Sequence, residues 1–162
     1  MKEMFVKRRS RVKSKEAKRI IAWMDDEYGI EFEEKPIVEM GSLNGDKAYI
    51  MKGRIVAIEE TGHLMLTLHG IMELKPRKRW VTVDMGAVKF LANGADVMSP
   101  GIIDADPEIE KDDLVWVRDE KNGRPLCVGR SLTGGPEMVR SDSGKAVKTV
   151  HFVGDPIWNA EL

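Results

Sequence analysis

Apolar residues near the start of the chain repeat at three- and four-residue intervals, the spacing of one face of a helix. The repeating positions are Ala17, Ile20, Ile21, Met24 and Tyr28. We expect a helix from about Lys15 to Tyr28, with Ser14 as its N-terminal cap and Gly29 at its end, because serine and glycine are favoured at those positions. The opposite face of this helix is polar and largely basic.

The pattern changes after Pro36 to short runs with strand character. The expected strands cover residues 37–40, 47–51 and 54–58, and glycine-containing turns separate them. These runs predict a small antiparallel sheet. The apolar stretch 63–74 fits both a strand and a helix, and we favour a short helix there.

A basic stretch broken by proline, residues 75–79, is the expected domain boundary. We therefore divide the chain into an N-terminal domain, residues 1–74, and a second domain, residues 75–162. The second domain should hold a short helix over 86–91 and several strands. These strands cover 80–83, 114–117, 125–128 and 147–153. Short strands separated by turns predict a compact barrel. The expected class is thus α+β, with a small α/β domain ahead of a β-barrel.

The distribution of charge changes what the average charge implies. A formal net charge of −1 over 162 residues would ordinarily argue against a nucleic-acid partner, because phosphate binding depends on Lys and Arg. Eight basic residues lie between positions 7 and 19, however, and six acidic residues lie between positions 25 and 34. This segregation predicts a dipolar surface. A merely solvated helix face with compensating acids is the alternative.

Signatures of other protein classes are missing from the sequence. No apolar run approaches the roughly 20 residues that cross a bilayer, so we expect a cytoplasmic protein without a membrane partner. Gly144-Lys145-Ala146 looks like the end of a phosphate-binding loop, but no Ser or Thr follows Lys145 and the earlier glycine is absent. Cys127 lies in an apolar run and is expected in the core, and the three histidines lack metal-ligand spacing. We expect no enzyme activity, no metal and no cofactor.

The most informative segment runs from Val83 to Ile102. Two pairs of small residues, Gly86-Ala87 and Gly94-Ala95, bracket a single helical turn, and small residues allow another backbone to approach closely. A phosphodiester chain is one candidate, since a helix start offers amide groups to an anion and Lys89 projects from the same turn. The alternative is a tight β-α-β connection in which glycine serves only packing.

This segment resembles the core motif of PUA domains, RNA-binding modules with a similar Asp-x-Gly-Ala-x-Lys-Phe, Gly-Ala and Pro-Gly pattern. Residues 126–129 are similar to a later strand of the family, and residues 144–147 and 150–158 resemble the ending of one branch, the malignant T-cell-amplified sequence proteins and the N-terminal half of ligatin. The resemblance is strong from Arg79 to Trp158 and faint before it. It implies an archaeal-type protein in which a PUA pseudo-barrel with short helices follows a divergent N-terminal domain.

The resemblance also implies where RNA would lie, namely against the short helix, the glycine loop after it and a neighbouring strand. The implied contacts are Gly86, Ala87, Lys89, Asn93, Gly94, Ala95 and Gly129. Phe90 belongs to the same turn, but we expect it in the core and exclude it. Basic residues near the two domain starts are added as phosphate contacts. They are Lys78, Arg79, Arg8, Arg9, Arg11 and Lys13. The acidic stretch 104–113 should face away from RNA.

Three functions remain open at this point. The first is a non-enzymatic factor that binds structured RNA, either ribosomal RNA or tRNA, on the small ribosomal subunit during initiation or recycling. Because the chain ends soon after Trp158, without the start-codon-reading domain of ligatin, such a role would require a partner that supplies that domain. The second is an accessory subunit that delivers RNA to a modification enzyme. A small-molecule-binding protein is the third and is disfavoured, since no convergent polar pocket is evident in the sequence.

Overall fold

The computed structural model describes residues 3–162 and divides into two compact units. Unit 1 comprises Met1–Arg77 and Gly154–Leu162, and unit 2 comprises Lys78–Val153. The division expected from the sequence differs from these units over residues 75–77 and 154–162. Among the described residues, no helix is both long and apolar enough to cross a bilayer.

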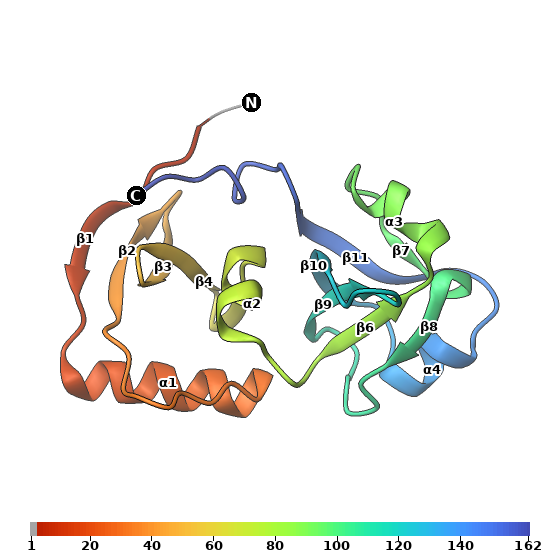
Figure 1. The fold of residues 1–162 in the computed structure, drawn as a ribbon, viewed down its shortest axis with the longest axis horizontal. Helices are drawn as coiled ribbons and strands as arrows, with labels where there is room; N and C mark the ends of the chain where they lie inside the picture. Colours follow the sequence, from red (N-terminus) through yellow and green to blue (C-terminus); the bar gives the residue numbers. More distant parts are fainter. Residues whose placement is uncertain (1–2) are drawn as a thin grey trace. The chain divides into compact units, whose positions relative to one another are not determined.

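Unit 1 is a five-stranded antiparallel sheet with two helices (Figure 1). Its elements are β1 (Lys7–Arg11), α1 (Ser14–Tyr28), β2 (Glu39–Leu43), β3 (Asp46–Met51), β4 (Arg54–Glu60), β5 (His63–Leu66) and α2 (Leu68–Leu74). The strands follow one another in the order β1-β2-β3-β4-β5. The apolar face of α1 is buried, and the hydroxyl of its last residue, Tyr28, donates a hydrogen bond to the carbonyl oxygen of Leu64 at 2.6 Å.

Helix α1 confirms the periodicity but not the proposed start. Gly29 ends the helix in the left-handed conformation, with φ of 65°, as expected. The N-cap is Lys13, which makes no side-chain capping bond, and the helix already includes Ser14. The Ser14 hydroxyl instead accepts a hydrogen bond from the Lys35 ammonium at 2.7 Å. The prediction of a Ser14 cap was therefore wrong by one residue.

Three other local predictions need correction. Strand β1 was not predicted, because all five residues from 7 to 11 are polar and show no apolar alternation; all five side chains are exposed. Residues 37 and 38 precede β2, which begins at Glu39 and ends at Leu43. The ambiguous stretch 63–74 contains both candidates, since β5 is followed directly by α2. Thr67 separates them, because its hydroxyl accepts a hydrogen bond from the Gly70 amide at 2.9 Å and caps α2.

Unit 2 is built on a six-stranded sheet in the order β7-β11-β10-β9-β6-β8. Its elements are β6 (Trp80–Val83), α3 (Met85–Leu91), β7 (Val97–Met98), the 3-10 turn η1 (Ser99–Gly101), β8 (Ile102–Ala105), β9 (Leu114–Asp119), β10 (Pro125–Ser131), α4 (Gly135–Arg140) and β11 (Lys145–Phe152). Strands β6 and β9 are parallel, and the other pairs are antiparallel. One apolar cluster fills the interior, with Val81, Leu91, Val115, Cys127 and Met138 among its members. The expected α+β class, with a barrel-like second half and short helices, is confirmed.

The last nine residues of the chain pack within unit 1. The Trp158 ring stacks on His69 with 4.0 Å between ring centroids. The Val6 amide donates a hydrogen bond to the carbonyl oxygen of Glu161 at 2.9 Å, and the Glu161 amide donates to Met4 at 3.0 Å. These contacts join the two ends of the chain, so the sequence of unit 2 is inserted between two segments of unit 1.

A glycine fixes how closely α2 approaches β4. A Cβ atom at Gly70 would collide with the backbone carbonyl of Val56, which cannot move without disturbing β4. We predict that Gly70→Ala lowers the free energy of unfolding by about 1–3 kcal/mol or more, the range for overpacked cores. Denaturant unfolding measures this loss. Gly45→Ala is the comparison, because no atom lies within 4 Å of a Cβ there and only the strain of φ +89° remains. Equal losses for the two variants would contradict the packing argument.

Candidate nucleic-acid interface

The short helix α3 begins directly after β6, and Asp84 caps it. The Asp84 carboxylate accepts a hydrogen bond from the Ala87 amide at 3.0 Å. A negatively charged group therefore already occupies the helix start, where it interacts favourably with the helix dipole. The expectation that this end offers free amide groups to a phosphate was wrong for the Ala87 amide. The Ala87 amide is therefore occupied, and the exposed side chains of the helix are further candidates for a contact.

The exposed face of α3 differs from the one expected. Leu91 is buried in the core of unit 2. Ala87 and Val88 precede Leu91 at helical spacing and also pack against that core. Phe90 therefore points away from the core, and it is 64% exposed. The prediction that Phe90 is a core residue was wrong. The spacing of Ala87, Val88 and Leu91 was the signal that could have shown this, because it defines the inward face without Phe90.

Two of the expected contact residues, Gly86 and Lys89, lie on that exposed face, and Ala87 is half-buried. Lys89 stands in the last turn of α3, where a cation is favoured by the helix dipole. Among the described residues, Lys89 forms no ion pair. Its charge is thus available to a ligand.

The loop after α3 satisfies its own backbone groups. The amides of Asn93 and Ala95 both donate to the carbonyl oxygen of Phe90 at 3.1 Å, and the Gly94 amide donates to that of Leu91 at 3.0 Å. The side-chain amide of Asn93 donates to the carbonyl of Lys89 at 3.2 Å. The loop is therefore a folded extension of the helix end.

Gly94 has two structural reasons to be glycine. Its φ is +85°, and a Cβ atom there would lie 2.8 Å from the ring of Phe152. The close neighbour of Gly94 is thus a side chain of the protein itself. A bulky residue at this position would disturb the fold, so such a variant cannot report an RNA contact cleanly.

Strand β11 anchors the loop through Thr149. The Thr149 hydroxyl donates to the carbonyl of Ala95 at 2.9 Å, and its amide donates to the Asp96 carboxylate at 2.9 Å. The other oxygen of Asp96 lies 3.1 Å from the Lys145 ammonium. Burial alone would raise the pKa of Asp96, but the Thr149 amide and the Lys145 charge lower it overall. The sequence could not indicate these contacts, because Thr149 lies 53 residues beyond Asp96.

Gly129 is not accessible in the way the resemblance implied. It is buried in β10, where the pairing with β11 shifts register between Val128 and Gly129. A Cβ atom there would collide with the carbonyl oxygen of Lys148. Gly129 therefore permits the close approach of β11 at a bulge. Direct contact of Gly129 with RNA stays a prediction, and the structure gives the residue this other role.

Lys78 and Arg79 lie at the start of unit 2. Lys78 is exposed, and its carbonyl accepts a hydrogen bond from the Trp116 indole at 2.9 Å. The Arg79 amide donates to the Asp106 carboxylate at 2.6 Å. The Arg79 guanidinium lies 3.8 Å from the Asp113 carboxylate. Arg79 thus stands among the acids that we expected to face away from RNA. The prediction that Arg79 contacts RNA therefore conflicts with the prediction that the stretch 104–113 faces away from it. The contact of Arg79 is the weaker prediction, because Asp113 offsets its charge.

The basic residues of the N-terminal segment are not equivalent. Arg8 and Arg11 lie in β1, an edge strand, and Lys13 follows it. Arg9 makes two hydrogen bonds to the Glu39 carboxylate, at 2.7 and 2.9 Å. Arg8, Arg11 and Lys13 are exposed and, within the described part of the chain, form no ion pair. Charged side chains also protect an open strand edge from pairing with other chains, which is the competing explanation.

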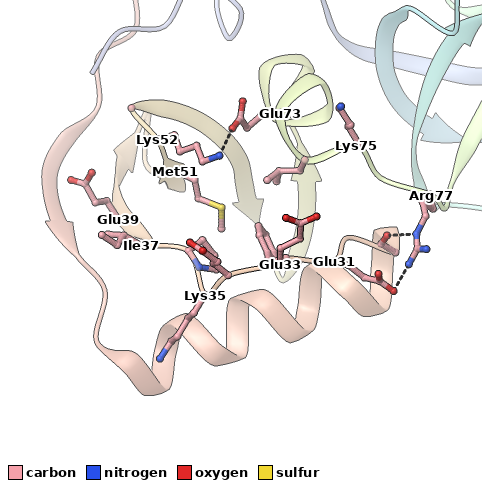
Figure 2. Close-up of a pocket in the computed structure, with 16 residues that line it drawn as sticks. Glu31, Glu33, Lys35, Ile37, Glu39, Met51, Lys52, Glu73, Lys75 and Arg77 are labelled. Atoms are coloured by element: carbon pink, nitrogen blue, oxygen red, sulfur yellow. Dashed lines mark hydrogen bonds and ion pairs between the residues drawn. The ribbon is translucent and has the colours of Figure 1, made fainter.

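Figure 2 shows an open groove in unit 1 that sequence patterns did not indicate. Its volume is about 900 Å³, and Ile37 and Met51 contribute apolar lining. Two ion pairs cross its rim, Lys52 with Glu73 at 3.2 Å and Arg77 with Glu31 at 2.6 Å. These charged groups are already paired with one another, so they are not free for a ligand.

The chemistry of catalysis and metal binding has little support in the described residues. Within residues 3–162, no group of three or more His, Cys, Asp and Glu side chains is placed to hold a metal ion. Cys127 is fully buried, as predicted, and burial raises the pKa of its thiol to about 12. A thiol in this state is a poor nucleophile at neutral pH.

The barrel of unit 2, with one short helix that presents exposed side chains, defines a small β-barrel binding domain. Comparison with known families matches residues 79–153 to the PUA domain. The chain belongs to the PUA-domain proteins. A solved structure of a hypothetical protein from Pyrococcus horikoshii is similar over 93% of this chain and 97% of that one, with a TM-score of 0.81 and 33% identity.

Curated relatives place the chain more closely within this family. An uncharacterized protein of Methanocaldococcus jannaschii is 43% identical over 122 residues, 75% of each chain. Translation machinery-associated protein 20 of Saccharomyces cerevisiae is 28% identical over 117 residues, 68% of this chain and 65% of the yeast protein. Malignant T-cell-amplified sequence 1 of Danio rerio is 30% identical over 80 residues, 48% of this chain and 44% of that one. The resemblance to this branch is confirmed.

One relative belongs to another functional class. Archaeosine synthase subunit alpha of Thermococcus kodakarensis is 33% identical over 126 residues. The match covers 75% of this chain but 21% of the synthase subunit. The similarity therefore concerns a limited part of that larger protein.

The anchor of the loop after α3 can be tested by substitution. We predict that Asp96→Ala lowers the free energy of unfolding by about 1–3 kcal/mol, because the Thr149 amide loses its acceptor and Lys145 loses its counter-charge. Asp96→Asn is the matched control, since it keeps an acceptor oxygen and should cost less. Urea unfolding curves at several pH values measure both variants.

The pH dependence of that loss follows from the lowered pKa of Asp96. A carboxyl whose folded pKa lies below its unfolded value of about 3.9 stabilises the fold above that pH, and the contribution is lost as the pH falls through the folded pKa. The stabilities of wild type and Asp96→Asn should therefore converge as the pH falls below about 4. A difference that stays constant down to the folded pKa would contradict this account.

Proposed function

We propose that this protein is a non-enzymatic factor that binds structured RNA through unit 2. The observation that carries the proposal is the exposed face of α3 in a PUA domain, where Lys89 has no acidic partner among the described residues. An exposed lysine without a counter-charge attracts phosphate and releases condensed counterions when it binds. Backbone contacts of this kind position a protein on RNA without reading its sequence.

The RNA is proposed to be ribosomal RNA or tRNA on the small ribosomal subunit, in initiation or recycling. Support comes from the relative named translation machinery-associated protein 20, whose match covers 68% of this chain. The same relationship supports a cytoplasmic location. A partner protein that supplies start-codon reading is part of the proposal.

Delivery of RNA to a modification enzyme is the second candidate function. The similarity to archaeosine synthase subunit alpha favours it, because that name denotes a subunit of an RNA-modifying enzyme. Affinity purification distinguishes the two functions. Recovery of a modification enzyme and its substrate RNA, in place of ribosomal proteins, would favour the second function over the first.

Ribosome sedimentation tests the first function. The protein should co-sediment with the small subunit in low salt, and Lys89→Glu should shift most of it to the top of the gradient, because a carboxylate replaces the proposed phosphate contact. Lys111→Glu is the matched control, since it makes the same charge change in the acidic stretch 104–113 and should sediment like wild type. Wild-type protein found only at the top of the gradient would exclude the ribosomal role.

The basic N-terminal segment is proposed as a second, sequence-independent phosphate contact. Replacing Arg8, Arg11 and Lys13 together with Ser should reduce the log-log salt slope of RNA affinity by about 2–3, from about 0.7–0.9 per phosphate contact. All RNAs should be weakened about equally. Arg9 is left unchanged, because Glu39 already neutralises it. Fluorescence anisotropy titrations over a range of salt concentrations give the slope.

A second triple variant separates local contact from total charge. Replacing Lys47, Lys75 and Lys121 with Ser removes the same number of charges from other exposed positions, and none of the three forms an ion pair among the described residues. The slope of this control should stay at the wild-type value. If β1 is basic only to protect its edge, the slope of the first triple variant will also be unchanged, and the proposed contact is wrong.

A further inference from the structure

The segment that joins α1 to β2, residues 31–37, lines the open groove of unit 1. It forms no helix or strand, and none of its backbone groups hydrogen-bonds to another backbone group within the described part of the chain. Both flanks are fixed, since Ile30 and Val38 are buried and the Val38 carbonyl accepts a hydrogen bond from the Val12 amide at 2.9 Å. The groove is therefore bordered by an anchored segment whose backbone donors and acceptors are uncommitted.

Ile37 gives this segment an exposed apolar side chain. It is 60% exposed, and Met51 of β3 and Leu74 of α2 also line the groove. A single apolar residue on a flat surface is common, but an exposed isoleucine beside an apolar hollow is a candidate contact for a partner. An apolar side chain of a ligand would find cover on Ile37 and the lining behind it.

The uncommitted charge of the segment is negative. Figure 2 shows Glu33 pointing into the groove, between the segment and α2. Glu33 and Glu34 are exposed and form no ion pair among the described residues. Lys35 points away from the groove, and its ammonium donates a hydrogen bond to the Ser14 hydroxyl at 2.7 Å (Figure 2). A ligand that lies along this segment therefore meets two carboxylates without a counter-charge.

A cation on the far side of the groove does not offset these carboxylates. Lys75 follows α2 and lines the groove there, and its ammonium is directed away from the segment (Figure 2). The two ion pairs at the rim offset their own charges. The charge that a ligand would meet beside Ile37 is thus that of Glu33 and Glu34.

These features favour a peptide over other kinds of ligand. A phosphate group would meet like charge at Glu33 and Glu34, so RNA is disfavoured here. Small molecules are held in concave sites that cover most of their surface, whereas this groove is open. A peptide brings a cationic side chain for the carboxylates, an apolar side chain for Ile37, and main-chain groups that can pair with the uncommitted backbone of the segment.

We propose that this groove binds a basic peptide segment of a partner protein. An apolar side chain of the peptide covers Ile37, and a lysine or arginine beside it meets Glu33 and Glu34. The groove belongs to unit 1, whereas α3 belongs to unit 2, so the peptide and RNA use different residues. Binding of the peptide does not require the proposed binding of RNA.

Selection from a library of random nine-residue peptides displayed on phage tests the proposal. The full-length wild type is the bait, and the double variant Glu33→Lys with Ile37→Ser removes peptides that bind elsewhere. Peptides retained by wild type alone should be enriched in Lys and Arg together with a large apolar residue. Enrichment of acidic peptides, or no enrichment over the double variant, would overturn the proposal.

Single variants then locate the contact, with the tightest selected peptide labelled with fluorescein for anisotropy titrations. Ile37→Ser should weaken binding about 10- to 100-fold, the effect of leaving one isoleucine side chain uncovered. Glu33→Lys should weaken it by about 10-fold or more, because like charges then meet. Glu60→Lys is the matched control, since Glu60 is an exposed glutamate of β4 outside the groove lining, and it should bind like wild type. Equal weakening by Glu33→Lys and Glu60→Lys would mean that the peptide responds to total charge, which overturns the site.

A charge exchange supplies a readout that a misfolded variant cannot produce. The selected peptide with its Lys and Arg residues replaced by Glu should bind Glu33→Lys more tightly than it binds wild type. If Glu33→Lys still prefers the original peptide, the charge contact is overturned. Ile37→Ser should keep the thermal midpoint and the RNA affinity of wild type, because the side chain is exposed and lies outside unit 2. A wild type that binds the selected peptides but no RNA would overturn the proposed RNA binding and support the groove.

Discussion

The surface that we assign to RNA depends on one short set of hydrogen bonds, those that join Thr149 of β11 to Ala95 and Asp96. Helix α3 has only seven residues, too few to hold its position by helical hydrogen bonding alone. Its first turn is fixed by Asp84 and its inward face by Leu91, while its far end is fixed by the loop that Thr149 holds. Because the strand is a rigid part of the sheet, the exposed side chains of α3 project from a defined place.

This arrangement gives the small residues of the segment different roles. Gly94 and Gly129 are small because other parts of the same protein approach them, the Phe152 ring in one case and the Lys148 backbone in the other. Gly86 is exposed instead, and the nearest atom to a Cβ there is the Asp84 carboxylate oxygen at 3.1 Å. Its small size therefore leaves space on the outer face of the helix. Gly94 and Gly129 thus serve packing. At Gly86 the interpretation that a small residue admits a ligand stays open.

Much of the fold could be predicted from the sequence because its signals are local. The periodicity of α1, the Gly29 stop and the turn-separated strands all depend on residues within one element. Strand β1 carries no apolar alternation, because it is an edge strand with five exposed side chains, so periodicity could not reveal it. The bonds from Thr149 to Asp96 connect positions far apart in sequence and leave no pattern. Phe90 was misplaced for a different reason, since an aromatic residue was assigned to the core by its type when its helical position put it outside.

The distinction between the type of a residue and its position also applies to the charged residues. Arg9 and Arg79 would count as phosphate contacts by residue type, yet Glu39 pairs with the guanidinium of the first and Asp113 with that of the second. Only cations without such partners contribute to counterion release, so the number of basic residues overestimates the salt dependence. Exposed charges are screened over about 8 Å at physiological salt, so attraction between exposed charges and RNA is weak beyond that distance. Recognition by this protein therefore has to depend on short-range contacts at a few uncommitted side chains, and the rigidity of the loop that positions them matters more than the total charge.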